Sequence, residues 1–177
     1  CTELAEYGAD RVIVVDDPEL KEYRTEPYAH ALTEVINKYK PEIMLIGATA
    51  IGRDLGPRVS ARVHTGLTAD CTLLEIGDFP INPVPGREQL HNQLLMTRPA
   101  FGGNTIATIA CPNFRPQMAT VRPGVMKKAP FDQAKADACQ IVKPAFALAA
   151  EDIKTEVLSV EKAAEKLVDL IGADVIV

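Results

Sequence analysis

Two Arg-Pro pairs are the residues of this chain whose types and spacing could do chemistry. Arg98-Pro99 and Arg122-Pro123 each follow a short run of β-forming residues, and each precedes a glycine. Because a guanidinium is planar and always charged, one held at the end of a strand is suited to stack on a flavin or to donate hydrogen bonds to it. Such a charge near the reacting nitrogens would stabilise a reduced, anionic flavin. The residue types alone are equally compatible with a surface arginine before a hairpin turn.

The neighbours of Arg98 extend this candidate site. Pro99 biases the backbone of Arg98 towards an extended conformation, and the Gly-Gly pair that follows predicts a turn. Asn104 comes directly after that pair and is equally compatible with being a turn residue. We therefore predict a cofactor-binding group made of Arg98, Thr97, Pro99 and Asn104, and no catalytic acid or base in this chain.

A second segment places glycines where an α/β fold could bind a phosphate. The predicted strand 42–48 leads through Gly47 and Gly52 into a predicted helix, and the N-terminus of a helix attracts anions. The segment matches neither G-x-x-x-x-G-K-[ST] nor G-x-G-x-x-G. Asp54, in the first turn of that helix, would repel a docked phosphate. Packing or a subunit contact is the favoured interpretation, and nucleotide binding is the alternative.

Metal binding and hydrolysis find no support in the spacing of residues. The histidines His30, His64 and His91 lie on different predicted elements with no carboxylate at ligand spacing, whereas a zinc site needs clustered Cys and His. Ser60 and Ser159 are the only serines, and neither lies in a G-x-S-x-G motif. We predict no metal site and no hydrolytic activity.

Charge, hydropathy and cysteine usage narrow the classes of partner and compartment. The net charge of −5 in 177 residues argues against nucleic acid, because phosphate binding needs a clustered basic surface. The apolar runs are shorter than the roughly 20 residues that a membrane span needs, and no targeting segment is visible. The four cysteines are widely spaced, so we expect reduced structural thiols. We expect a cytoplasmic protein, or a protein of the mitochondrial matrix if the source is eukaryotic.

The elements that must position these residues begin as an alternation of strand and helix. After a short helix in the first eight residues, the patterns predict strand 11–17, helix 27–39, strand 42–48 and helix 52–63. Runs of apolar β-branched residues predict strands buried on both faces, and the helices carry apolar side chains at i, i+3, i+4 spacing. This order predicts right-handed βαβ units and a parallel sheet.

The middle of the chain predicts a different kind of pairing. Short β-type runs joined by Gly, Pro and Asn occupy 70–76, 93–97, 105–111 and 117–121. Because no helical pattern separates these runs, we expect hairpins and antiparallel neighbours. The proline-rich stretch 78–88 predicts an exposed loop.

The last third of the chain is harder to assign. Residues 141–150 are compatible with strand or helix, while the alternation over 152–160 predicts a strand. Ser159 is expected to cap a helix over 162–172, and 173–177 predicts a further strand.

Together these patterns predict a single α/β domain over 1–177. The expected fold is three-layered and Rossmann-like (adenine-nucleotide α-hydrolase-like), with a mostly parallel sheet and an antiparallel hairpin portion. The chain opens inside a helical pattern without a cap and closes inside an apolar run. We therefore expect both ends to be cuts through a longer polypeptide.

Four stretches of sequence resemble one known family along most of the chain. They read IMLIGATAIGRDLGPRVSARVHTGLTADC, LLMTRPAFGGNTIATIACP, PQMATVRPGVM and EKLVDLIGADVIV. Their wording and order are similar to the N-terminal domain of the α subunit of electron-transfer flavoproteins. The resemblance implies a heterodimer with a β subunit, three domains, and FAD bound in a C-terminal domain of the α subunit that this chain lacks.

The resemblance also implies how such a protein would work. In ordinary members the β subunit binds AMP, and the heterodimer carries electrons from acyl-CoA dehydrogenases to a quinone reductase. In bifurcating members a second FAD replaces AMP, takes a hydride from NADH and splits the electron pair between two acceptors. Arg98 would then face the cofactor bound by the β subunit, and this chain alone would not hold the α-subunit FAD. The alternative hypothesis is a stand-alone nucleotide-binding module of the universal-stress type.

Overall fold

The computed structural model of the chain describes residues 2–82, 84–161, 173 and 175. Short 3-10 turns (η1–η3) lie between some of the regular elements. The elements in chain order are α1 Thr2–Glu6, β1 Arg11–Ile13, η1 Pro18–Leu20, α2 Thr25–Tyr39, β2 Ile43–Gly47, α3 Ala50–Arg62, β3 Leu67–Cys71, β4 Leu73–Phe79, β5 Leu90–Pro99, η2 Phe101–Gly103, β6 Ile106–Ile109, β7 Gln117–Val121, α4 Gln133–Ala138, β8 Gln140–Val142 and η3 Ala150–Asp152.

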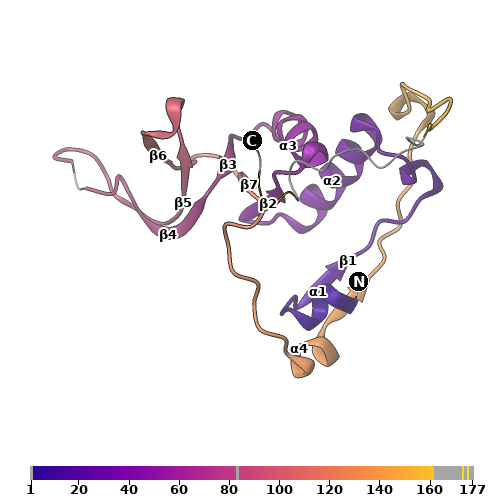
Figure 1. Ribbon diagram of the computed structural model, residues 1–177, viewed down its shortest axis with the longest axis horizontal. Helices are drawn as coiled ribbons and strands as arrows, with labels where there is room; N and C mark the ends of the chain where they lie inside the picture. The colour runs from indigo at the N-terminus through magenta and orange to yellow at the C-terminus, as the bar shows by residue number, and fades with distance from the viewer. Residues whose placement is uncertain (1, 83, 162–172, 174, 176–177) are drawn as a thin grey trace.

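The described strands form two parallel sheets and one antiparallel sheet (Figure 1). The parallel sheets have the strand orders β2-β7-β3 and β1-β8, and the antiparallel sheet has the order β4-β5-β6. The antiparallel sheet projects to the left of Figure 1, away from the helices. The predicted α/β class, mostly parallel with an antiparallel portion and consistent with a Rossmann-like three-layer fold, is confirmed.

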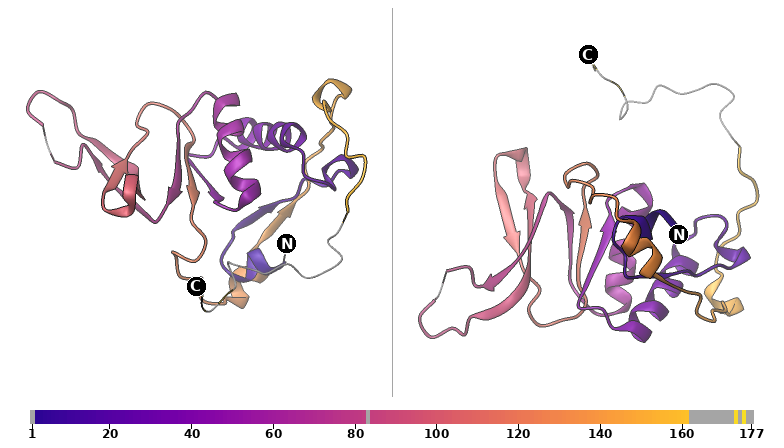
Figure 2. Two further views of the ribbon diagram at one scale, coloured as in Figure 1. Left: turned by 45° about the horizontal axis from the view of Figure 1, so that its top comes forward. Right: turned by 90° about the horizontal axis from the view of Figure 1, so that it is seen from below.

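Helices α2 and α3 cover one face of the sheet β2-β7-β3 (Figure 2). Their apolar stripes meet the sheet in a core cluster that includes Ile36 of α2, Val59 of α3 and Met118 of β7. Val59 and Met118 are fully buried. The helices predicted at 27–39 and 52–63 are therefore confirmed, because a stripe of this spacing is stabilised by burial against a sheet.

The antiparallel sheet packs against the opposite face of β2-β7-β3. Leu94 and Met96 of β5 form a second core cluster with Cys71 of β3 and Ala119 of β7. Successive side chains of a strand point to opposite faces, so Met118 faces the helices and Ala119 faces the antiparallel sheet. The parallel sheet is thus the middle layer of this part of the chain.

Strand pairing differs from the prediction at two places. The run 117–121 is a strand as predicted, but it is the central, parallel strand of β2-β7-β3 and has no antiparallel neighbour there. Four of its five residues are buried, which suits a strand covered on both faces. Strand β2, predicted to be buried on both faces, lies at the edge of its sheet, and Leu45 is half exposed.

The region after β7 departs most from the sequence patterns. Residues 140–142 form a short strand beside β1. The strand predicted over 152–160 is wrong, because the described backbone there has no ladder partner and only its first residue belongs to η3. The helix predicted over 162–172 lies outside the described residues, as does most of the strand predicted over 173–177.

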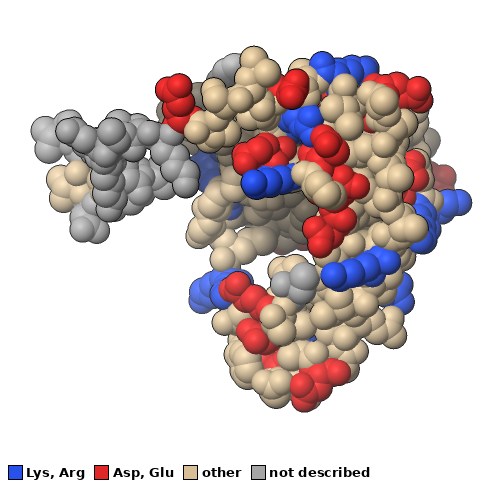
Figure 3. All heavy atoms as spheres, turned by 90° about the vertical axis from the view of Figure 1, so that its right-hand side faces the viewer, with Lys and Arg blue, Asp and Glu red and all other residues tan. Residues whose placement is uncertain are grey.

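Charged side chains of both signs alternate over the face shown in Figure 3. Two ion pairs, Arg24 with Glu19 at 2.6 Å and Arg58 with Glu26 at 2.7 Å, place opposite charges side by side near α2. The described helices include none that is both long and apolar enough to cross a membrane.

Candidate functional site at the junction of β3 and β4

The fold brings the two Arg-Pro pairs to one place, the junction at which β3 passes into β4. The backbone N–H of Arg122 donates to the carbonyl oxygen of Cys71 at 2.9 Å, and the N–H of Thr72 donates to the carbonyl oxygen of Thr97 at 2.9 Å. Arg98 is the next residue of β5. Residues 71 and 72 therefore stand between the two pairs.

This junction lies at the carboxyl ends of the parallel strands β7 and β3, where open α/β sheets bind their ligands. Arg122 follows the last residue of β7, and Asp70 is the penultimate residue of β3. Helix α3 begins at the same edge, because the N–H of Ala48, directly after β2, donates to the carbonyl oxygen of Val121 at 2.7 Å. The position is one from which a side chain could reach a ligand or another subunit.

Arg98 is a half-buried cation at this junction. Alternation along β5 puts its side chain on the face that carries Leu94 and Met96, toward the parallel sheet. Its Nε donates to the carbonyl oxygen of Pro99 at 3.3 Å. Burial raises the pKa of the Cys71 thiol, and the positive charge of Arg98 acts in the opposite direction.

Arg98 differs from most arginines of the chain in having no acidic partner among the described residues. Among the described residues, no carboxylate lies within ion-pair distance of its guanidinium. The arginines that do pair with a carboxylate are Arg24, Arg53, Arg58, Arg62, Arg115 and Arg122. A half-buried charge without a partner is costly unless a further group compensates it.

Asp70 pairs with two other arginines at the same junction. Its carboxylate lies 2.6 Å from Nη2 of Arg122 and 3.0 Å from Nη2 of Arg53. The hydrogen bond from Arg122 is the largest cause that lowers the pKa of Asp70, and partial burial opposes it. No sequence motif marks this aspartate, and we did not predict it.

The other predicted cofactor-binding residues are not gathered around Arg98. Thr97 and Pro99 have their side chains on the opposite face of β5, and the Thr97 hydroxyl is hydrogen-bonded to that of Thr108 at 2.9 Å. Asn104 is exposed and ends the turn η2. The backbone contacts thus bring Thr97 and Arg98 to the same junction as Arg122 and Asp70, but the side chains of Thr97 and Pro99 lie on the other face of β5 and Asn104 lies in the turn beyond it.

The segment Gly47–Gly52 is built for close packing. A Cβ atom added to Gly52 would lie 1.8 Å from the carbonyl oxygen of Gly47, so helix α3 approaches the end of β2 too closely for any side chain. The hydroxyl of Thr49 accepts from the N–H of Gly52 at 3.1 Å, and Nε of Arg53 donates to the carbonyl oxygen of Ala48 at 2.9 Å. The polar groups of this turn satisfy one another, which supports the packing interpretation.

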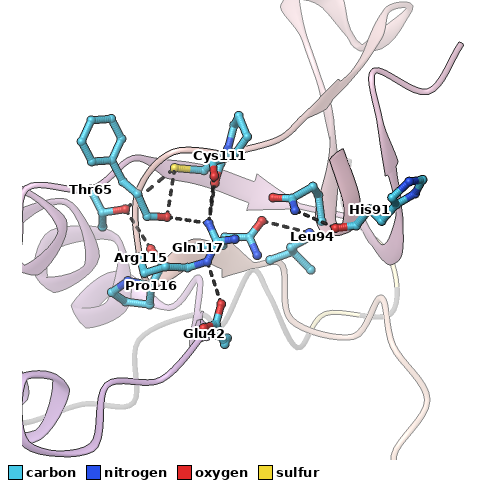
Figure 4. Close-up of polar contacts among 11 residues, drawn as sticks. Glu42, Thr65, His91, Leu94, Cys111, Arg115, Pro116 and Gln117 are labelled. Atoms are coloured by element: carbon cyan, nitrogen blue, oxygen red, sulfur yellow. Dashed lines mark hydrogen bonds and ion pairs between the residues drawn. The ribbon is translucent and has the colours of Figure 1, made fainter. Parts of the chain in front are cut away.

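A second polar network holds β5 in place from the other end of β7 (Figure 4). The buried side chain of Gln117 accepts a hydrogen bond from the N–H of Leu94 at 2.9 Å, across the two sheets. Beside it, Arg115 donates to Glu42 at 2.7 Å and to the carbonyl oxygen of Cys111 at 3.2 Å. This network fixes the strand that presents Arg98.

In the part of the chain that the structure describes, no group of three or more His, Cys, Asp or Glu is arranged to hold a metal ion.

Known proteins match this chain over nearly its whole length. The family described as "Electron transfer flavoprotein domain" matches residues 1–147. The acryloyl-CoA reductase electron transfer subunit beta of Anaerotignum propionicum is 54% identical over 99% of this chain and 51% of its own length. Protein FixB of Clostridium saccharobutylicum is 47% identical over 99% of this chain and 48% of its own length. Electron transfer flavoprotein subunit alpha of Thermoanaerobacterium thermosaccharolyticum is 49% identical over 99% of this chain and 49% of its own length. The chain therefore spans about half the length of the relatives it matches.

These names correct the prediction of an α subunit. The relative with 54% identity is named subunit beta, and a third relative is named subunit alpha. The name of protein FixB does not say which of the two subunits it is. The assignment to an α subunit is therefore wrong, because relatives with different subunit names match the same residues of this chain. What the match of 147 residues does show is the family itself. This chain belongs to the electron transfer flavoprotein family.

Proposed function

We propose that this chain is part of one subunit of a two-subunit electron carrier and forms one wall of a flavin site that the other subunit completes. The observation that carries the proposal is Arg98, a half-buried guanidinium for which no described residue supplies a carboxylate. An anionic group from outside the described residues would compensate it. The reduced flavin of an electron transfer flavoprotein is a group of this kind.

The residues of the junction fit a flavin as one wall and not as an enclosing pocket. Arg98 offers a planar, permanently charged donor at the carboxyl edge of the parallel sheet. Open hollows of about 300 and 420 Å³ lie elsewhere, lined in part by residues of α2. We therefore propose that FAD belongs to the longer protein, and that the other subunit holds AMP or a second FAD opposite Arg98.

A bound flavin supplies the capacity to take up and pass on electrons, and Arg98 would set how readily it does so. A guanidinium beside the ring lowers the energy of its negatively charged reduced form, so the reduction potential rises. The gain is larger at a half-buried position than in open water, because the effective dielectric constant is lower there. The hydrogen-bond network at Gln117 would keep this charge at a constant distance from the ring.

The outer surface of the antiparallel sheet is the surface that we propose for docking of the other subunit. It exposes large apolar side chains on two strands next to the Arg98 end, Leu73 on β4 and Ile106 on β6. Exposed apolar side chains gathered on one surface commonly mark a protein interface. Docking there would bring the other subunit to the end of β5 at which Arg98 lies, on the face opposite to its side chain, so the other subunit would reach the guanidinium around this end of the strand.

The redox partners of the whole protein follow from the family and its relatives as proposals. One relative is named as the electron transfer subunit of an acryloyl-CoA reductase, so we propose an acyl-CoA dehydrogenase or a related reductase as the partner enzyme. Two FAD per heterodimer would indicate the bifurcating mode with NADH, and one FAD with AMP would indicate the ordinary carrier. A cytoplasmic location stays a prediction.

The decisive experiment is a redox titration of the full-length heterodimer with Arg98→Ala. We expect the reduction potential of one flavin to fall, because the variant loses a positive charge beside the ring. Arg87→Ala is the matched control, since Arg87 lies in the loop between β4 and β5, at the other end of β5. Potentials that are the same in Arg98→Ala as in the unaltered protein, for every flavin present, would reject the proposal.

A further inference from the structure

Three arginines come from residues at or next to the junction of β3 and β4, and one carboxylate pairs with two of them. Asp70 pairs with Arg122 through two contacts, Oδ2 to Nη2 at 2.6 Å and Oδ1 to Nε at 3.2 Å. Its Oδ1 also accepts from Nη2 of Arg53 at 3.0 Å. Arg98, which follows the Thr97 residue bonded to Thr72, receives no carboxylate from the described residues.

The backbone holds Asp70 in a conformation that most residues avoid. Its φ is +62°, in the left-handed region, and the pairing of β3 with β7 is irregular between Thr68 and Cys71. Asp and Asn tolerate this region better than other residues with a side chain. The N–H of Asp70 donates to the buried hydroxyl of Thr120 at 2.8 Å, which fixes the residue to the central strand.

The ion pairs also join three separate elements. Arg53 comes from the start of α3, Asp70 from the end of β3, and Arg122 from the residue after β7. Both arginines keep about half of their side-chain surface exposed, 54% and 44%, while the carboxylate between them is only 18% exposed. Without the carboxylate, Arg53 would keep its hydrogen bond from Nε to the carbonyl oxygen of Ala48, whereas Arg122 would keep no side-chain partner among the described residues.

We propose that Asp70 is a positioning residue at the junction of β3 and β4, where Arg98 would face the flavin. By holding Arg53 and Arg122 in ion pairs, it leaves Arg98 as the guanidinium of the junction, among the described residues, that is available to an anionic flavin. Asp70 thereby neutralises part of the positive charge beside the flavin ring. It also keeps Arg53 and Arg122 from pairing with the flavin in place of Arg98. This inference rests on the proposed function, because it concerns the charge that the flavin experiences.

Asp70→Asn in the full-length heterodimer tests the inference. Asparagine tolerates the left-handed backbone and keeps the hydrogen bond from its backbone N–H to the Thr120 hydroxyl. The change therefore removes the negative charge with little change of shape. We expect the potential of one flavin to rise, opposite in sign to the effect of Arg98→Ala. A purely structural role for Asp70 would change the stability and leave the potential where it was.

Glu26→Gln is the matched control for this variant. Glu26 also pairs with two arginines, Arg58 at 2.7 Å and Arg62 at 3.4 Å, and its exposure of 25% is similar. These pairs join α2 to α3, away from the junction. The control removes the same charge from an equivalent cluster, so we expect it to leave every flavin potential unchanged.

The outcomes separate this inference from the proposed function. If Arg98→Ala lowers a potential and Asp70→Asn leaves it unchanged, the role of Asp70 is rejected and the role of Arg98 stands. If neither variant shifts a potential, both proposals fail. If the Asp70→Asn heterodimer does not assemble, Arg122→Gln is measured in its place. This variant leaves the negative charge of Asp70 less compensated, so we expect the potential of one flavin to fall. An unchanged potential overturns the inference.

Discussion

The side-chain oxygen of Gln117 accepts a hydrogen bond from the backbone N–H of Leu94 at 2.9 Å and so joins the parallel sheet to the antiparallel one. Gln117 is 2% exposed and Leu94 is 3% exposed, so water cannot replace this bond. The contact lies in β5, and Arg98 is four residues further along the same strand. It therefore links the packing of the two sheets to the position of the candidate flavin-facing charge.

Replacing Gln117 with leucine should destabilise the protein by about 1–3 kcal/mol, because a buried backbone N–H loses its acceptor. Urea unfolding measures this change. Gln133→Leu is the control, since the exposed Gln133 donates a hydrogen bond to Asp137 within α4, and its replacement should change the free energy of unfolding by about 0.5 kcal/mol or less. Equal effects of the two substitutions would contradict the proposed importance of the bond between the sheets.

Gly52→Ala should be among the most damaging small substitutions in the chain. The added methyl group would lie 1.8 Å from the carbonyl oxygen of Gly47, so α3 must move away from β2. We expect a loss of more than about 3 kcal/mol, in the range of severe overpacking. Gly47→Ala provides the comparison, because its added carbon would meet only the Thr49 methyl at 3.9 Å. Thermal unfolding that ranks the two variants the other way would refute this reading of the turn.

The ion pairs of Asp70 should contribute to stability at neutral pH and not in strong acid. The contacts with Arg122 and Arg53 hold the folded-state pKa of Asp70 below its ordinary value of 3.8. For a lowered pKa, the stabilisation is present above the unfolded-state pKa of about 3.9 and is lost as the pH falls through the folded-state value. The stability difference between the unaltered protein and Asp70→Asn should therefore shrink between pH 7 and pH 3. Urea unfolding at the two pH values checks this, and a constant difference would count against the ion pairs.

Ile106→Ser should weaken association with the other subunit while leaving the fold intact. Ile106 is 71% exposed on β6, so the change costs the isolated chain little, about 0.5 kcal/mol or less. Leu158→Ser is the control, because Leu158 is 88% exposed and lies outside the antiparallel sheet. The dissociation constant of the full-length heterodimer measures both. Equal affinities for the two variants would argue against docking on this sheet.

Local patterns predicted individual elements well because they depend on neighbours in the chain. The spacing of apolar side chains predicted α2 and α3 to within two residues at each end. The run 117–121 was predicted with the observed bounds of β7. Its pairing was predicted wrongly, because the order of strands in a sheet depends on contacts between distant segments. The predicted strand at 152–160 failed for the same reason: alternation alone does not supply a partner strand.

At the candidate site, too, the sequence predicted what depends on nearby residues and missed what depends on distant ones. The sequence by itself determined the family, most helices and strands, and Arg98 as a candidate, because these depend on residue types and short spacings. It contained no signal for Asp70, whose partner Arg122 is 52 residues away. Only the tertiary structure decided which guanidinium has a carboxylate and which has none among the described residues, because an ion pair requires two side chains within about 4 Å of each other, a distance that folding alone creates.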